Sequence, residues 1–195
     1  AYVVAYHVAC QLLPSGSFAR NLVSDLGFVA FEVVAVVLCF VAWRFNRGRS
    51  DQWVWIGVGV WLLFNLFADS VWAYYEVVAQ VEVPFPGLAD AGYLASYVVA
   101  FATAVVAARK ASGRLRAIET TLDAMMLTLG VAAVLWPFVL GPLVSESEGS
   151  FGFWVNLAYP VGDLLIILAF VSFFLATSVP GRRRPPTYFI IICVA

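Results

Sequence analysis

Residues 26–41 read LGFVAFEVVAVVLCFV, a nearly continuous apolar run whose single charged residue is Glu32. A second run, residues 124–140, contains no charged residue. The strands of a membrane β-barrel alternate apolar and polar residues, whereas continuous runs of this length are typical of membrane-spanning helices. These runs therefore predict an all-α fold, a polytopic bundle of transmembrane helices.

The composition of the whole chain agrees with this prediction. Of its 195 residues, 63% are hydrophobic and 12% are charged, and the mean hydropathy is +0.93. Soluble domains are about half apolar and about a quarter charged, so one soluble core would have to hide too much apolar surface. The expected partner is the lipid bilayer. The formal net charge of -1 gives no basis for a nucleic-acid partner.

The lengths of the apolar segments predict how often the chain crosses the bilayer, since a spanning helix needs roughly 20 residues. Five complete spans are expected, at residues 21–43, 53–79, 90–108, 122–140 and 151–177. Two shorter apolar segments, residues 1–13 and 187–195, read as partial spans. We therefore expect residues 1–195 to be one transmembrane domain, truncated at both ends, from a protein with seven or eight helices.

Basic residues predict the orientation of the bundle. Ten of the eleven follow the first, third and fifth expected spans: Arg44, Arg47, Arg49, Arg109, Lys110, Arg114, Arg116, Arg182, Arg183 and Arg184. Only Arg20 falls on the other side. The positive-inside rule makes these Arg-rich loops cytoplasmic. The loops at residues 14–18, 80–89 and 141–150 are then external.

Acidic residues inside the expected spans are the first candidates for function, because carboxylates are costly in the bilayer. Glu32, Asp69 and Asp163 each lie about ten to twelve residues from an outer end, a depth of roughly 15–18 Å at about 1.5 Å per residue. The three acids either line one cavity or lie on unrelated faces. For Glu32, the alternative is a protonated carboxyl that is hydrogen-bonded to a neighbouring helix.

A polar stripe on the second span extends this set. Asn65, Asp69, Trp72 and Glu76 are spaced four, three and four residues apart, which places them on one helix face. Tyr159 and Asp163 repeat the pattern on the fifth span. Such stripes either bind or sense a ligand, or hold helices together through hydrogen bonds.

Three further polar residues have competing interpretations. Asp90 ends the proline-rich turn at residues 83–90, where it either caps the following helix or faces the same outer cavity. Asp123, at the start of the fourth expected span, is predicted to act as a cap. The alternatives for His7, the only histidine, are a structural role, pairing with one of the buried acids, a pH-sensitive group, or a ligand of a metal or pigment.

Motifs of soluble enzymes are absent from the sequence. It has no glycine-rich phosphate loop, no nucleophile elbow and no two-histidine metal motif, so neither a catalytic residue nor a metal site is predicted. No cofactor can be assigned. We therefore expect this chain not to be an enzyme.

The order of several polar and aromatic residues resembles a known family. The series runs Asp69-x-x-Trp72-x-x-x-Glu76, Pro84-x-Pro86-x-x-Ala89-Asp90-x-x-Tyr93-x-x-x-Tyr97, Leu122-Asp123, Trp136 and Ala158-Tyr159-Pro160-x-x-Asp163. It is similar to the multi-helix N-terminal membrane domain of bacterial, especially actinobacterial, signalling proteins with cytoplasmic GGDEF diguanylate cyclase and EAL phosphodiesterase modules. The resemblance covers residues 18–184. Where the family usually has serine after the prolines, this chain has Gly87.

This resemblance implies a sensory input domain in the bacterial inner (plasma) membrane, acting in cyclic-di-GMP signalling. The predicted site is an outer-half cavity lined by Asp69, Trp72, Glu76, Asp90 and Asp163, with Asn65, Tyr93 and Tyr159 as further candidate ligand-binding residues. The expected assembly is a homodimer or larger. One alternative is a structural or accessory subunit of a larger membrane complex. Another is a small proton-coupled transporter, although the sequence shows no inverted repeat of broken helices.

Overall fold

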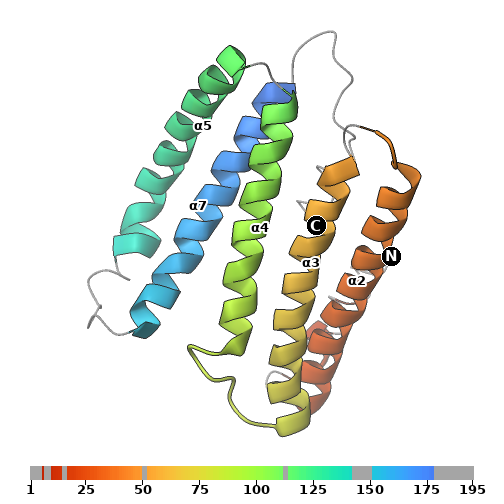
Figure 1. The fold of residues 1–195 in the computed structure, drawn as a ribbon. Coiled ribbons are helices and arrows are strands. Elements are labelled where there is room, and N and C mark those ends of the chain that lie inside the picture. The colour runs from red at the N-terminus through yellow and green to blue at the C-terminus, as the bar shows by residue number, and fades with distance from the viewer. Residues whose placement is uncertain are drawn as a thin grey trace. The chain divides into compact units, whose positions relative to one another are not determined.

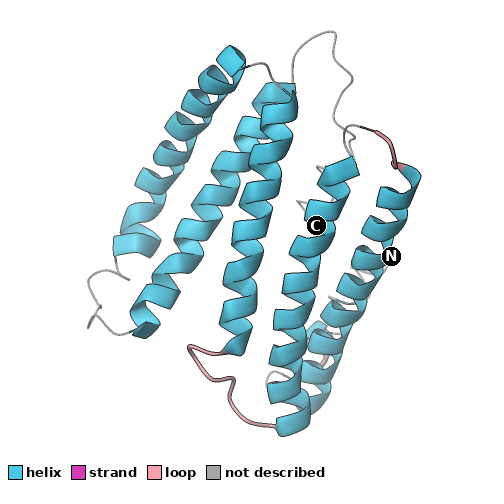
Figure 2. Ribbon diagram, viewed as in Figure 1, coloured by secondary structure: helices cyan, strands magenta, loops and turns pink. Residues whose placement is uncertain are grey.

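Helices make up all the regular structure that the computed structural model describes, which covers residues 6, 10–14, 17–49, 52–111, 114–141 and 151–177 (Figures 1 and 2). The α-helices are α2 (Phe18–Phe45), α3 (Gln52–Ala73), α4 (Leu88–Ala111), α5 (Arg114–Leu135) and α7 (Phe151–Thr177). Two π-helices, η1 (Tyr74–Ala79) and η2 (Trp136–Leu140), extend α3 and α5. The all-helical fold predicted from the sequence is confirmed.

Four helical segments are long and apolar enough to cross a membrane: Phe18–Phe45, Gln52–Ala79, Leu88–Ala107 and Phe151–Ser172. These match four of the five predicted spans. In the segment predicted as the fourth span, the described residues give the apolar helix Leu122–Phe138. The α-helix ends there at Leu135, next to Pro137, which has no N–H to continue the hydrogen-bond ladder. The structure therefore supports four spans and leaves the fifth a prediction.

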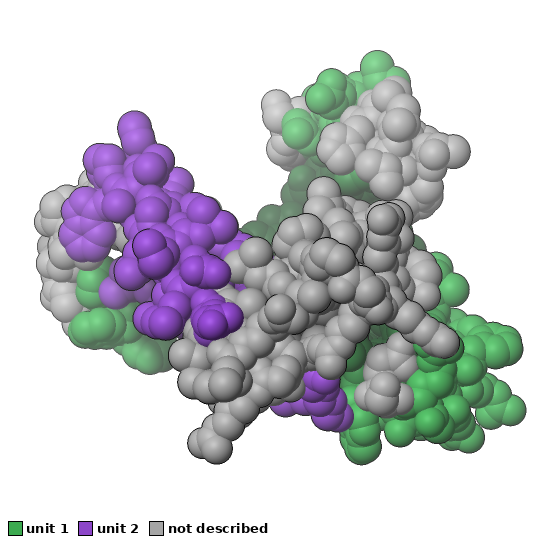
Figure 3. Space-filling model, turned by 90° about the horizontal axis from the view of Figure 1, so that it is seen from above, with its two compact units in different colours: residues 1–100, 149–155 green, residues 101–148, 156–195 purple. Residues whose placement is uncertain are grey.

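The chain, expected to form one helical domain, divides into two compact units (Figure 3). The first unit contains Ala1–Ala100 and Gly149–Val155, and the second contains Phe101–Glu148 and Asn156–Ala195. In the described chain, α2, α3, η1, the first half of α4 and the first turn of α7 belong to the first unit. Each unit is described by itself below.

Small residues occupy the buried positions, and large apolar residues face outward. The buried apolar residues are Cys39, Val58, Ala68, Ala73, Ala89, Ala104, Ala107, Ala124, Val155 and Ala169. Aromatic side chains such as Phe28, Phe40 and Trp53 are more than half exposed. Helices in lipid associate through close contact of small side chains, while large apolar groups remain in the hydrocarbon. This distribution is the one expected of a membrane protein.

Helices α2 and α3 form a hairpin whose ends are capped by their own side chains. Ser17 begins α2 by accepting a 3.2 Å hydrogen bond from the Arg20 N–H. Asn46 ends α2, and its side-chain amide donates to the Ala42 carbonyl at 2.7 Å. The Arg47 guanidinium lies 4.3 Å from the ring centroid of Trp43, a cation–π contact. After this turn α3 packs along α2, and the two lie side by side in Figure 1.

Gly92 allows α4 to approach α3 closely. A Cβ atom at Gly92 would lie 2.9 Å from the Ala68 Cβ and 3.0 Å from the Phe67 Cδ1. Ala68 is itself fully buried. The two backbones are thus as near as a glycine and an alanine permit, which resembles the small-residue contacts of membrane helix pairs.

The turn before α4 is closed by Asp90, which was predicted either to cap this helix or to face the cavity. Helix α4 begins at Leu88, so Asp90 is its third residue, and its Oδ2 accepts from the Gly87 N–H at 2.8 Å. This is the returning half of a capping box. A Cβ at Gly87 would lie 2.3 Å from the Pro84 carbonyl oxygen, so this turn requires glycine.

The capping role predicted for Asp123 is wrong. Helix α5 starts at Arg114, well before Asp123, which lies exposed within the helix. The sequence suggested a later start because the strongly apolar part of this helix begins only at Leu122.

Candidate functional site

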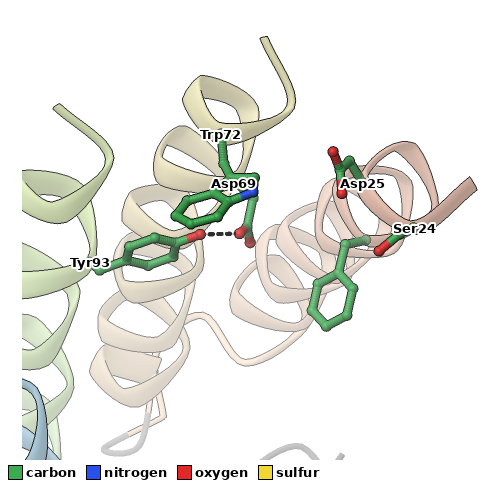
Figure 4. Close-up of a pocket in the computed structure, with 6 residues that line it drawn as sticks. Ser24, Asp25, Asp69, Trp72 and Tyr93 are labelled. Carbon is green, nitrogen blue, oxygen red and sulfur yellow. Dashed lines mark hydrogen bonds between the residues drawn. The ribbon is translucent and has the colours of Figure 1, made fainter. Parts of the chain in front are cut away.

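A cavity of about 240 Å³ with two aspartates in its wall lies in the first unit, between α2, α3 and α4. Its lining residues are Ser24, Asp25 and Phe28 from α2, Asp69 and Trp72 from α3, and Tyr93 from α4. Figure 4 shows Tyr93 reaching toward Asp69 from one side, with Ser24 and Asp25 on α2 at the other. Of the residues predicted for the site, the structure brings Asp69, Trp72 and Tyr93 together here.

A hydrogen bond between Tyr93 and Asp69 joins two helices across the cavity wall. The Tyr93 hydroxyl donates to Asp69 Oδ1 (Figure 4). Tyr93 directly follows Gly92, whose close contact with Ala68 holds α4 against α3 one residue before Asp69. The short helix–helix distance therefore places the phenol within reach of the carboxylate. Hydrogen bonds to charged groups are stronger than neutral ones.

Four carboxyl groups follow the interface between α2 and the α3–η1 helix. Asp25 and Glu32 are seven residues apart on α2, which places them on one face, and Asp69 and Glu76 have the same spacing opposite. Asp25 interacts electrostatically with Glu76 and, more weakly, with Asp69. Glu32 interacts with Asp69. The predicted proximity of buried acids thus holds for Glu32 and Asp69.

Two of these carboxyl groups have a buried oxygen without a hydrogen-bond partner among the described residues, Asp25 Oδ2 and Glu32 Oε2. Glu32 as a whole is only 7% exposed. The alternative predicted for it, a protonated carboxyl hydrogen-bonded to a neighbouring helix, is consistent with its interaction with Asp69 on α3. Buried polar groups without partners are rare and concentrate at functional sites.

The three spans that carry these acids contain no basic residue that could pair with them. Residues 21–43, 53–79 and 90–108 contain no lysine, arginine or histidine, yet they include Asp25, Glu32, Asp69, Glu76 and Asp90. The three helices of the cavity therefore carry only negative formal charge over these ranges.

Asn65, the first member of the predicted stripe, takes part in helix packing. Its side-chain N–H donates to the Trp61 carbonyl at 2.9 Å, and its Oδ1 accepts from the Ser96 hydroxyl at 3.5 Å. The same hydroxyl donates to the Tyr93 carbonyl at 2.7 Å. For Asn65, these contacts favour the packing interpretation over ligand binding, since they join α3 and α4 below the cavity.

Glu76, the last member of the stripe, lies in the π-helix η1 and is half-buried. This wider helix ends at Gln80, which has a left-handed φ of 53°, and the Gln80 N–H donates to the Tyr75 carbonyl. Short π-helical segments often occur at functional sites. Glu76 is not part of the cavity lining and contributes through its interaction with Asp25.

The remaining predicted residues lie elsewhere. Asp90 is buried at the start of α4, where it closes the preceding turn. Tyr159 and Asp163 belong to the second unit, in which Tyr159 is half-buried and Asp163 is exposed on α7. Pro160 lies within α7, which continues through it. His7 lies outside the described residues.

The contribution of α2 was missed by the sequence analysis. Ser24, Asp25 and Phe28 lie near the start of the first span, where polar residues are common and carry little information. The seven-residue spacing of Asp25 and Glu32 was the available signal, because it predicts a polar face on α2. Tyr6 also reaches this region, donating to the Ser24 carbonyl at 3.4 Å.

No protein-family model, curated protein or solved structure matches this chain. In the described ranges, no three histidine, cysteine or acidic side chains are grouped so that they would hold a metal ion.

Proposed function

We propose that this chain is the membrane-embedded input domain of a bacterial signalling protein, with the cavity of Asp25, Asp69, Trp72 and Tyr93 as its signal-binding site. The observation that carries the proposal is this cavity with two aspartates in its wall, which lies between helices whose outer surfaces are apolar. Ionisable residues within membrane helices mark functional sites by default. The resemblance of the Asp69–Tyr97 motif to sensory membrane domains supports the same role.

The Tyr93–Asp69 hydrogen bond is the element through which a bound signal would act. It joins α3 to α4 at the cavity wall, so a ligand that interacts with Asp69 competes with the Tyr93 hydroxyl or strengthens its contact. A ligand shifts a two-state equilibrium only by its differential affinity for the two states. In one of the two states this hydrogen bond joins α3 and α4, and in the other it is broken. The balance between the states controls the activity of a cytoplasmic output module in a homodimer or larger assembly.

The proposed location is the bacterial inner membrane, with the Arg-rich loops in the cytoplasm. We expect a Glu82→Cys variant to react with a membrane-impermeant maleimide in intact spheroplasts, because Glu82 lies in the exposed loop before α4. A Ser50→Cys variant should react only after permeabilisation. Both are made in a background without Cys10, Cys39 and Cys193. The reverse labelling pattern would contradict the orientation.

The proposed output is cyclic-di-GMP synthesis or breakdown, and its test starts from the native polypeptide. Sequencing and intact-mass measurement should reveal a GGDEF or EAL module beyond Ala195. In the full-length protein, Tyr93→Phe should then change the basal output by about tenfold, since a hydrogen bond to a charged group contributes about 1.5–3 kcal/mol. The exposed Tyr74, in η1, provides the control variant Tyr74→Phe, which should leave the output unchanged.

Two results would overturn this proposal. A polypeptide that ends after one or two more helices would have no output module, and an accessory subunit of a larger complex would become the better hypothesis. An output that responds equally to Tyr93→Phe and Tyr74→Phe would remove the cavity from the signalling path. Thermal unfolding of both variants shows whether any change in output reflects lost folding.

A further inference from the structure

The geometry points to a small organic ammonium ion as the ligand of this open cavity, held by Asp25 and Asp69 beside aromatic rings. This inference rests on the proposed input function and specifies the chemistry of its signal. It is carried by three properties of the cavity: its charge, its aromatic lining and its size.

The charge of the lining calls for a cation. Asp25 and Asp69 are its two ionisable acids, and one buried oxygen of Asp25 has no partner in the described chain. Glu32 lies one turn below Phe28, is more than nine-tenths buried, and interacts with Asp69 while its Oε2 also lacks a described partner. A buried carboxyl group is either protonated or paired with a positive charge, and residues 21–43, 53–79 and 90–108 contain no such charge. A bound cation would provide it.

The aromatic lining indicates an organic cation. Trp72, Tyr93 and Phe28 contribute rings from three different helices. Aromatic faces attract ammonium groups through cation–π interactions, and tryptophan is the strongest partner. Cages of such rings with a nearby carboxylate are a recurring way to recognise alkylated ammonium groups. A bare metal ion, by contrast, prefers converging oxygen ligands.

The cavity volume limits the size of the ligand. At about 240 Å³ the cavity is smaller than the roughly 300–1,000 Å³ of sites for drug-sized molecules. A head group such as choline or ethanolamine is of suitable size, whereas a polyamine chain is not. The same ammonium chemistry occurs in free metabolites and in phospholipid head groups, and a cavity in the outer half of membrane helices is accessible to either source.

Binding of free choline to the purified full-length protein tests this inference. In dodecyl maltoside, a detergent without charge or ammonium groups, calorimetric titration should show saturable binding. The neutral isostere 3,3-dimethylbutan-1-ol should bind about tenfold more weakly or not at all. Asp69→Asn and Asp25→Asn should each weaken choline binding by about tenfold, as expected when a charge-assisted contact is lost. Trp72→Leu should weaken it about two- to fivefold.

Matched controls separate the cavity from general effects of charge and ring removal. Glu82→Gln removes an exposed carboxylate outside the cavity, and Trp154→Leu removes an exposed tryptophan on α7, so both should keep the wild-type affinity. Each variant is accepted only if it elutes as a single species and unfolds cooperatively. A repeat in phosphatidylglycerol nanodiscs with and without phosphatidylethanolamine identifies the source. Competition by the phosphatidylethanolamine indicates a lipid head group, and its absence indicates a free amine.

Equal binding of choline and its neutral isostere, or wild-type affinity in both aspartate variants, would overturn the ammonium inference. Selective binding of sodium ions at the same residues would overturn it as well. These failures are distinct from failure of the input function. If choline binds but does not change the output, the signalling role is refuted and the ammonium-binding site stands. If the output depends on Tyr93 but choline does not bind, only the ligand class is refuted.

Discussion

Gly92→Leu is expected to lower the thermal unfolding temperature by roughly 5–10 °C, the largest loss of stability among the changes considered. A side chain at this position meets the Ala68 Cβ at 2.9 Å and the Ala68 Cα at 3.3 Å, so the backbones of α3 and α4 have to separate. Overpacking of this kind destabilises by about 1–3 kcal/mol, and 1 kcal/mol corresponds to roughly 2–4 °C for a chain of this size. Separation of the helices also breaks the Tyr93–Asp69 hydrogen bond.

Gly130→Leu provides the matched control for this variant. Gly130 lies within α5, and a Cβ there meets no atom within 4 Å. Both substitutions replace a helical glycine by leucine and gain the same helix propensity, about 0.8 kcal/mol. The difference between the two unfolding temperatures therefore reports the effect of the steric clash at Gly92. Unfolding is followed by tryptophan fluorescence in dodecyl maltoside. Equal unfolding temperatures for the two variants would show that the close approach of α3 and α4 does not stabilise the protein.

Glu32→Leu is expected to act in the opposite direction and to raise the free energy of unfolding by about 1–3 kcal/mol. Glu32 is buried, and its Oε2 has no hydrogen-bond partner in the described chain. Removing a buried polar group without a partner eliminates its desolvation penalty, and leucine suits a membrane interior. If Glu32 supports cation binding, the variant gains stability while its affinity for choline falls. Such opposition between stability and function is typical of binding sites.

Val34→Leu is the control for Glu32→Leu, because Val34 lies two residues away on the exposed, lipid-facing side of α2. Its unfolding temperature should stay within about 2 °C of the wild type, as surface changes usually shift stability by about 0.5 kcal/mol or less. A Glu32→Leu variant that unfolds at a lower temperature than the wild type would mean that the carboxyl group has a stabilising partner, such as a bound water or cation.

The helices were the most predictable part of this protein. The spans predicted at residues 21–43 and 53–79 correspond to Phe18–Phe45 and Gln52–Ala79, because long apolar runs end at arginines, prolines and polar turns. The predicted span 122–140 falls within the helix formed by α5 and η2, which changes from α- to π-helix after Leu135. The π-helix η1 was missed. Nothing in the sequence of Tyr74–Ala79 differs from that of an α-helix, so its geometry depends on tertiary packing.

The contribution of one helix to the candidate site could be predicted from the sequence, but the contacts with the other helices could not. The spacing of Asp69 and Trp72 gave their common face directly, because helical periodicity is a local property. Which helix lies opposite is a non-local property, so the pairing of Asp69 with Tyr93 and Glu32 required the structure. The close approach at Gly92 could not be predicted either, since a glycine within a helix does not reveal which residue it approaches.

The small-residue interior and large-residue exterior of this protein also determine the heat capacity of its unfolding. In a water-soluble protein, unfolding exposes apolar surface to water, and the resulting large positive heat-capacity change makes the stability curve a dome. Here Phe28, Phe40 and Trp53 already face the surroundings in the folded state, and the buried surface belongs mostly to alanines. Helices that separate within a bilayer exchange these contacts for lipid instead of water. The free energy of unfolding in the membrane should therefore vary almost linearly with temperature, without the loss of stability in the cold that the hydrophobic effect produces in water.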